Sequence, residues 1–349
     1  MANDDISLIA VGDVFVSGVI NHTGGRVQDN RRNNPNAVFD LVPPFLRGKD
    51  IIFCNLEGPF CKPGRPLQYK RSSWCSEPRN VSALKYAGFN IVSLANNQTM
   101  GYGPDGLMET IETLKSNGIA YVGAGENLDE ARRPKILSQK NTKIGFLARF
   151  TNQYPAGLSL LGYGARENSP GVAQLVVSPL YEPPQVNELD FEQFEEDVRM
   201  AKSMSDVLIV GCHMGVQGQA LTMHQPAIAH KAIDCGADLV VCTHPHRIQG
   251  IEAYKGRLIF YSIGNFALDF NYAQQPKESI ILDCVVSNKT IKKIVVRPCL
   301  LNQGSERQTK ILQEPTKDGE RIFAMLDKLS KKLGTTLSYE DGEIKVLVD

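Results

Sequence analysis

The sequence has no surplus of charge of either sign. Its 349 residues include 38 lysines and arginines and 38 aspartates and glutamates, so the formal net charge at pH 7 is zero. A protein without a basic surplus exerts no overall attraction on nucleic acid or on anionic lipid. We therefore expect no nucleic-acid partner.

Long apolar runs are also missing. No stretch approaches the roughly 18 consecutive apolar residues of a membrane-spanning helix. The first residues, MANDDISLIAVGDV, lack the basic flank and the long apolar run of a signal peptide. We therefore expect no membrane span and a cytoplasmic location.

Paired cysteine motifs are absent as well. The eight cysteines form no C-x-x-C pair, and several lie inside apolar runs such as IIFCNL and LVVCTH. This pattern favours buried thiols over disulfides or a zinc site. The cysteines are Cys54, Cys61, Cys75, Cys212, Cys235, Cys242, Cys284 and Cys299.

Short apolar runs that alternate with amphipathic segments are abundant. Runs such as SLIAVGD, IIFCNLE, IVSLANN, KIGFLARF, VLIVGCH and LVVCTH are apolar on both faces, which predicts strands covered on two sides. Helical periodicity predicts helices at residues 79–87, 104–118, 189–204 and 223–236. The alternation of strands and helices indicates an α/β protein with polar residues at the strand ends.

Two regions depart from this alternation. Residues 153–188 are rich in proline and glycine and show little periodicity, so they form either an ordered excursion over the site or a plain surface connection. From residue 278, alternating segments predict antiparallel strands, and residues 321–334 predict a closing helix. We interpret residues 1–349 as a single domain with its motifs at 6–270 and a strand and helix extension at 278–349.

Three of the six histidines follow predicted buried strands. His213 ends VLIVGCH, while His244 and His246 form an H-x-H pair after LVVC. The proline between the pair fixes the bend of the loop, so both imidazoles can face neighbouring metal ions. One histidine alone would more often be structural, but three at equivalent strand ends favour a metal site.

Oxygen ligands follow strands in the amino-terminal half. Asp13 follows LIAVG, Asn55 and Glu57 follow IIFC, and Asn96 and Asn97 follow IVSLA. Taken singly, each would be explained by a turn or a helix cap. Together with imidazoles they suit divalent ions, and two ions usually require a bridging carboxylate.

The motifs that carry these residues occur in the order of a known family. GDVFVSG, NLEGPF, VSLANNQ, CHMG, ADLVVCTHPH and YSIGNF span about residues 6–270. The chain resembles the poly-gamma-glutamate capsule-biosynthesis (CapA-type) family, which is similar to the calcineurin-like metallophosphoesterases. The resemblance implies a four-layer fold, in which a β-sandwich is flanked by helices and the site lies on loops at one end.

The resemblance also implies how the ligands divide between two ions. Asp13 and His246 would bind one ion, Asn97, His213 and His244 the other, and Glu57 would bridge them, with Asn55 as a close neighbour. The metal itself stays open among manganese, zinc and iron. If the histidines are only structural, no metal binds.

The chain departs from the family at three ionisable positions. The usual N-N-H reads Asn96-Asn97-Gln98, the usual Asp-Tyr-Gly reads Gly101-Tyr102-Gly103, and the usual H-W-G-x-E ends at Gln217. A glutamine can donate a hydrogen bond but cannot titrate, and proton transfer is typically worth about 10² to 10⁴ in rate. We take Gln98, Asn97 and His213 as the candidate catalytic residues and expect chemistry that differs from that of an ordinary phosphatase.

Four basic residues are candidates for holding an anionic substrate. Arg247 directly follows the H-x-H pair, and Lys70, Arg71 and Arg149 are the others. Arginine binds a carboxylate or a phosphate with a bidentate fork, so a glutamyl or a phosphoryl group would fit.

Two functions follow from these residues and the resemblance. The first is a soluble metal-dependent hydrolase or transferase of metallophosphoesterase ancestry that acts on a small anionic substrate, either glutamyl-containing or phosphorylated. The alternative is a non-catalytic binding or assembly component of poly-gamma-glutamate or capsule biosynthesis, which binds a glutamyl polymer or a partner synthetase through the same cleft.

Overall fold

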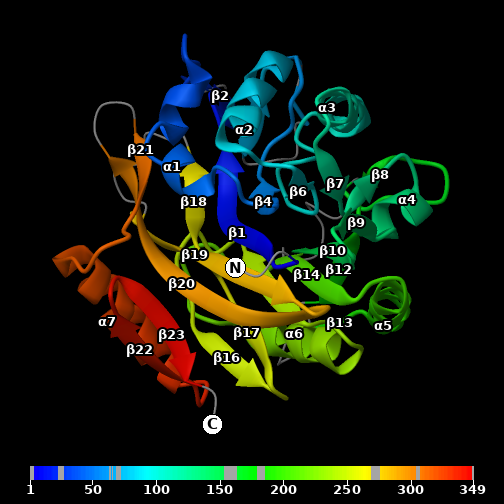
Figure 1. The fold of residues 1–349 in the computed structure, drawn as a ribbon. Coiled ribbons are helices and arrows are strands. Elements are labelled where there is room, and N and C mark those ends of the chain that lie inside the picture. Colours follow the sequence, from blue (N-terminus) through cyan, green and yellow to red (C-terminus); the bar gives the residue numbers. More distant parts are fainter. Residues whose placement is uncertain are drawn as a thin grey trace.

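The computed structural model describes residues 4–22, 27–62, 64, 66–67, 72–152, 163–178, 185–268, 276–303 and 307–347. Two large mixed sheets and a set of flanking helices account for most of these residues (Figure 1). The α/β class predicted from the sequence is confirmed.

The first sheet has ten strands and contains both the amino-terminal and the carboxyl-terminal strands. Strands β1, β4, β6 and β7 run parallel to one another, whereas β19 pairs antiparallel with β1. In spatial order the sheet consists of β22 (Thr336–Glu340), β23 (Glu343–Leu347), β20 (Thr290–Gln303), β19 (Glu278–Ser287), β1 (Ile6–Phe15), β4 (Ile51–Leu56), β6 (Ile91–Ser93) and β7 (Ala120–Val122), with β18 (Asn265–Leu268) beside β1 and β21 (Gln308–Ile311) beside β20.

The second sheet has eight strands, and its centre is parallel. Strands β10, β14, β15 and β17 run in the same direction. In spatial order the sheet consists of β13 (Gln185–Val186), β12 (Gln174–Ser178), β10 (Thr142–Asn152), β14 (Val207–His213), β15 (Leu239–Thr243), β17 (Arg257–Phe260) and β16 (Ile251–Tyr254), with β9 (Lys135–Gln139) beside β10.

Two small sheets and the helices complete the described structure. The small sheets are β3 (Val27–Asp29), β2 (Gly18–His22) and β5 (Ser72–Ser76), and the pair β11 (Gly171–Val172) and β8 (Ala124–Gly125). The helices are η1 (Pro35–Phe39), α1 (Pro43–Leu46), η2 (Pro78–Asn80), α2 (Val81–Ala87), α3 (Gly103–Ser116), α4 (Leu128–Arg132), α5 (Glu188–Ser203), α6 (His224–Asp234) and α7 (Lys317–Lys331).

Alternation along β10 places the second sheet between two cores. Phe146 and Phe150 join the core shared with the first sheet, and the Phe146 ring lies 5.3 Å from the ring of Phe53 on β4. Leu147 points the other way and belongs to a core that includes Phe194 of α5. Because successive side chains of a strand face opposite sides, this one strand contacts both a sheet and a helix.

The four predicted helices are confirmed as α2, α3, α5 and α6 within a few residues. Helix α2 ends at Ala87 and is followed by Gly88, whose φ of 88° is the left-handed conformation that terminates helices. The predicted strands from residue 278 are β19 and β20, and they pair antiparallel. No helix within the described ranges is long and apolar enough to span a membrane.

Two segments differ from the sequence-based expectation. Within residues 153–188, the described part 163–178 forms β11 and β12, and β12 extends the second sheet beside β10. The closing helix begins earlier, at Lys317, because the Thr316 side chain accepts a hydrogen bond from the Gly319 amide. The helix is followed by the hairpin of β22 and β23, which pairs with β20 and so adds two strands to the first sheet.

Candidate metal centre

The polar residues predicted at strand ends meet where the parallel strands of both sheets end. Asp13 on β1 is the register partner of Asn55 on β4 and of Asn265 on β18, and His213 on β14 is the partner of Thr243 on β15. The carboxyl ends of parallel strands are the usual position of ligand sites in α/β proteins. Glu57 follows β4, and His244 follows β15.

The first group of potential ligands consists of Asp13, Glu57 and His246. Nδ1 of His246 lies 3.4 Å from Oδ2 of Asp13, and Nε2 of the same ring lies 3.6 Å from Oε1 of Glu57. One ligand atom from each of the three residues lies within 4.8 Å of the other two.

The second group consists of Glu57, His213 and His244, again with ligand atoms within 4.8 Å of one another. Nε2 of His213 lies 3.7 Å from Oε1 of Glu57 and 2.9 Å from Nδ1 of His244. The same Nε2 lies 3.1 Å from Oδ1 of Asn97. Glu57 therefore belongs to both groups, and the structure brings together all six residues that the sequence proposed as ligands.

The cluster is buried and carries opposing charges. Asp13 and Glu57 are both 0% exposed, so their carboxylates are removed from water. Although burial lowers the pKa of His246, the nearby carboxylates of Glu57 and Asp13 outweigh it and raise that pKa to about 9. Burial and the charge of His246 lower the pKa of His244 to about 3, which keeps that imidazole neutral. Buried carboxylates beside neutral imidazole nitrogen suit a divalent cation.

Polar neighbours that the sequence analysis missed orient the rings. Nδ1 of His246 lies 2.8 Å from Oδ1 of Asn265, and because an amide oxygen only accepts, Nδ1 carries the proton and Nε2 faces Glu57. Nδ1 of His213 lies 2.9 Å from Oγ1 of Thr243. Partners of this kind fix the tautomer of metal-binding histidines. Asn265 is part of the YSIGNF motif and Thr243 directly precedes His244, so both positions were visible in the sequence.

The predicted near neighbour, Asn55, links the two groups. Its Nδ2 donates to Oδ1 of Asp13 over 2.7 Å and lies 3.2 Å from Nδ1 of His213. Its Oδ1 in turn accepts from Nδ2 of Asn96 over 3.1 Å. Asn96 is fully buried and therefore supports the cluster from behind.

The loop that carries the histidine pair has an unusual backbone. His244 has a φ of 100° and His246 a φ of 56°, both outside the range that most L-residues adopt. Such conformations cost about 1–3 kcal/mol each and are typical of functional sites. Gly12 permits the close approach of β1, because a Cβ there would lie 1.9 Å from the carbonyl oxygen of Gly264.

The single tryptophan of the chain lies beside the cluster. The ring of Trp74 on β5 is 6.4 Å from the ring of His246 and 5.5 Å from the ring of Phe15. Trp74 is 6% exposed, and it packs in a small core with Phe15, Ile20 and Leu268. It forms an apolar wall on one side of the cluster.

The candidate catalytic residues adjoin the cluster to different degrees. Asn97 and His213 contact each other directly, as described above. Gln98 is 4% exposed, and its backbone amide donates to Oδ1 of Asn96 over 3.0 Å. Of the other two residues that replace the family's ionisable groups, Gln217 is exposed and Gly101 is buried, where its backbone amide donates to the carbonyl of Gln98 over 2.8 Å.

The basic candidates for substrate binding have three different positions. Arg247 is exposed next to the histidine loop, and it donates to the carbonyl of Gly218 over 2.9 Å. Arg149 is not brought to the cluster, because its place on β10 turns it to the face opposite Phe150, where it pairs with Asp197 of α5. Lys70 and Arg71 lie outside the described residues.

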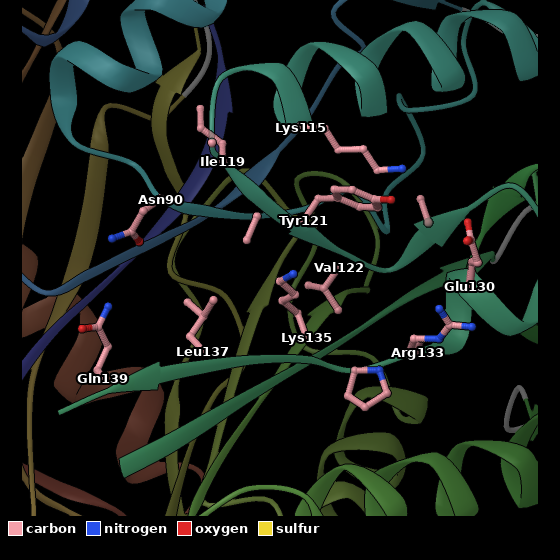
Figure 2. Close-up of a pocket in the computed structure, with 14 residues that line it drawn as sticks. Asn90, Lys115, Ile119, Tyr121, Val122, Glu130, Arg133, Lys135, Leu137 and Gln139 are labelled. Carbon is pink, nitrogen blue, oxygen red and sulfur yellow. The ribbon is translucent and has the colours of Figure 1, made fainter. Parts of the chain in front are cut away.

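A separate groove lies between edge strands β7 and β9 of the two sheets. It has a volume of about 580 Å³, and Ile119, Val122 and Leu137 line its apolar part. Figure 2 shows Lys135 between the two strands, with Lys115 beside Tyr121 on one side and Arg133 near Glu130 at one end. Arg149 is absent from its lining, and so are the six candidate ligands.

The sequence matches the family described as "Bacterial capsule synthesis protein PGA_cap" over residues 7–270. The chain belongs to this family. The family lies within the metallophosphoesterase-like superfamily, so the resemblance read from the motifs is confirmed.

Curated relatives of the PGA_cap protein cover its whole length. The chain is 27% identical over 350 residues to the capsule biosynthesis protein CapA of Bacillus anthracis. That alignment covers 99% of this chain and 78% of the Bacillus anthracis protein. The chain is also 27% identical over 351 residues to the PGA biosynthesis protein CapA of Bacillus subtilis (strain 168), covering 100% of this chain and 84% of that protein. A crystal structure of a hypothetical protein from Thermus thermophilus aligns with a TM-score of 0.49 and 14% identity, covering 84% of this chain and 98% of that chain.

Proposed function

We propose that this PGA_cap protein is a metal-dependent hydrolase or transferase that acts on a small anionic substrate, either glutamyl-containing or phosphorylated. The observation that carries the proposal is the pair of buried ligand groups that share Glu57. In this proposal Asp13 and His246 hold one ion, Asn97, His213 and His244 hold the other, and Glu57 bridges them. The ions would be manganese, zinc or iron.

The residues around the ions would position the ligands, bind the substrate and donate a hydrogen bond. A bound pair of ions would supply a water of lowered pKa and polarise an oxygen of the substrate. Asn265 and Thr243 would hold His246 and His213 in place, and Arg247 would bind the anionic group of the substrate. Gln98 would donate a hydrogen bond to the leaving oxygen without transferring a proton. We also propose that the two sheets and their helices correspond to the four-layer metallophosphoesterase fold, and that the protein is cytoplasmic.

Metal content and turnover, measured together, test this function. The protein is dialysed against Mn²⁺, Zn²⁺ or Fe²⁺, and bound metal per chain is measured by elemental analysis. Hydrolysis of generic phosphoesters and of γ-glutamyl amides is then measured with each metal. Glu57→Gln keeps the shape of the bridging side chain but removes its charge, so we expect it to lose metal and activity together.

A matched control separates the cluster from histidines in general. His230 lies outside the cluster, stacked on Tyr254 with its Nε2 2.9 Å from Oε2 of Glu252. His230→Gln should therefore keep both metal and activity. Metal that remains stoichiometric in Glu57→Gln would contradict the proposed ligand set, and bound metal without turnover would favour the alternative below.

A non-catalytic component of polyanion biosynthesis is the second candidate, and the groove of Figure 2 favours it. Lys115, Arg133 and Lys135 line the groove, and among the described residues none of them pairs with a carboxylate. Glu130 is the acidic residue of the lining, and it accepts the amide of Glu126 over 3.2 Å. An extended glutamyl polymer would place methylenes on the apolar part of the groove and carboxylates near the three cations.

Binding of a labelled poly-gamma-glutamate oligomer, followed by fluorescence anisotropy, tests this second function. Reversing two charges with Lys115→Glu and Lys135→Glu should weaken binding by about tenfold or more. Lys332, an exposed lysine beyond α7, provides the control Lys332→Glu. Equal weakening by the control would mean that the polymer senses only net charge and not the groove.

A further inference from the structure

Two cysteines that are 14 positions apart in the sequence touch each other beside the cluster. Sγ of Cys61 lies 3.1 Å from Sγ of Cys75, and the second sulfur lies 2.8 Å from the carbonyl oxygen of Cys61. Both residues are 1% exposed and share a small core with Tyr102. From the sequence we expect unpaired buried thiols, and the spacing of this pair gives no sign of the contact.

The backbone holds the two cysteines in this arrangement. The amide of Cys61 donates to the carbonyl of Ser76 over 2.9 Å, and the amide of Ser76 donates to the carbonyl of Pro59 over 3.0 Å. Phe60 and Ser76 form a parallel β-bridge. The segment after β4 and strand β5 are therefore fixed side by side, and the two sulfur atoms meet without a rearrangement of the chain.

We propose that Cys61 and Cys75 form a reversible intramolecular disulfide. A disulfide has a sulfur to sulfur distance of about 2.05 Å, so the sulfur atoms need to approach by only about 1 Å. Cys212 and Cys242 are also close to each other, as register partners on the parallel strands β14 and β15 at the centre of the second sheet. The Cys61 and Cys75 pair joins two segments at the edge of the β2, β3 and β5 sheet instead.

The oxidant in this proposal is a peroxide. One thiol attacks the peroxide oxygen and becomes a sulfenic acid as one water leaves. The second sulfur then attacks the sulfenic sulfur, forms the disulfide and releases a second water. In total two thiols and one hydrogen peroxide give one disulfide and two waters. The hydrogen bond to Cys75, followed by burial, raises the pKa of the Cys61 thiol, so oxidation is slow at neutral pH and faster under mildly alkaline conditions.

The bond would tie together two segments that contact the cluster. Glu57 lies four residues before Cys61, and Trp74 directly precedes Cys75. The Trp74 ring lies beside His246, as described above, so the disulfide would fix the apolar wall of the cluster relative to Glu57. This proposal does not depend on whether the cluster binds metal.

The sole tryptophan gives the experiment its own reporter. The purified protein is incubated with hydrogen peroxide at mildly alkaline pH, and its intact mass, its thiols after denaturation and its tryptophan fluorescence are measured. We expect the mass of two hydrogen atoms to be lost and two of the eight thiols to disappear. Fluorescence should fall, because a disulfide next to an indole quenches it, and dithiothreitol should restore all three signals.

A non-reducing peptide map of the wild-type protein identifies the pair without any variant. A cross-linked peptide that contains Cys61 and Cys75 supports the proposal, whereas an unchanged thiol count or a cross-link between other cysteines overturns it. Cys75→Ala should abolish the mass loss and the fluorescence change. Cys235→Ala, which removes a cysteine at the end of α6, should leave both intact. A fluorescence change that persists in Cys75→Ala would also overturn the proposal.

Discussion

Two groups of charged side chains lie on opposite sides of strands β10 and β14, and they differ in how their charges are paired. On the face of the first sheet, two acids and three histidines converge within a few ångströms. On the face of α5, Asp197 lies between two arginines: Arg132 donates to both of its oxygens over 2.8 and 2.9 Å, and Arg149 donates to one of them. In the second group every charged side chain contacts one of opposite charge, so these contacts account for the group as part of the packing between the sheet and α5. The first group suits a cation that the chain does not itself provide.

The largest effect is expected at the buried ion pair of Arg149 and Asp197. Asp197→Ala would leave the guanidinium of Arg149 buried without its counter-charge. We expect the free energy of unfolding, measured by urea denaturation, to fall by about 3–5 kcal/mol. Bound metal should be unchanged in the folded fraction. A loss below about 1 kcal/mol would show that solvent reaches the Arg149 guanidinium and compensates for the missing carboxylate.

A paired replacement sharpens this prediction. Arg149→Met combined with Asp197→Leu removes both charges and leaves apolar groups against Phe194. Because a buried ion pair can often be replaced by apolar groups at little cost, we expect the double variant to be more stable than Asp197→Ala. Equal destabilisation of the two variants would mean that packing, not charge, is responsible.

A buried histidine outside both groups, His224, tests how burial makes stability depend on pH. Burial lowers the pKa of His224, the first residue of α6, from 6.5 to about 4. Between these values the unfolded chain binds the proton and the folded chain does not. Stability should therefore be complete above pH about 6.5, decrease as the pH falls and stop decreasing near pH 4, by about 3 kcal/mol at most. Urea denaturation at a series of pH values measures this change, and His224→Gln should remove it.

A smaller effect is expected from the neighbours that orient the cluster. Asn265→Ala removes the acceptor at Nδ1 of His246, and partners of this type typically contribute about 10–100-fold to metal affinity. Asn265→Asp keeps an acceptor at the same place and should restore most of that affinity. Titration with Zn²⁺ in the presence of a competing chelator distinguishes the two variants. Identical Zn²⁺ affinities of the two variants would contradict the proposal that Asn265 orients His246 for metal binding.

The smallest change in stability is expected for Arg247→Ala. Its side chain is exposed, and such substitutions usually change the free energy of unfolding by less than about 0.5 kcal/mol. If Arg247 binds the anionic substrate, the variant should raise KM with little change in metal content. An unchanged KM would contradict the proposed role of Arg247 in substrate binding.

The sequence was sufficient to predict that Asp13 and Glu57 lie close together, because the carboxyl ends of parallel strands meet at one edge of a sheet. His213 lies on the second sheet, and it was grouped with them through the family resemblance. It was not sufficient for Arg149, since only the alternation of the finished strand decides which face a side chain takes. The contact between Cys61 and Cys75 depends on how the segment after β4 pairs with β5, and no local pattern encodes that pairing.

The elements of the fold also differ in how well the local sequence pattern predicts them. Helices with regular periodicity and a terminal glycine, such as α2, were predicted within a few residues. Strand β12 was missed, because short strands in a segment rich in proline and glycine give little periodic signal. The hairpin of β22 and β23 was missed for a similar reason, since half-exposed strands alternate weakly.

Elemental analysis of the purified protein and of Glu57→Gln, after dialysis against Mn²⁺ or Zn²⁺, tests the proposed metal centre most directly. We predict two ions per chain for the wild-type protein and for His230→Gln, and a loss of both ions in Glu57→Gln, because this carboxylate belongs to both ligand groups. A wild-type protein that retains no metal, or a Glu57→Gln variant that retains as much as the wild type, would contradict the assignment of this cluster as a metal centre.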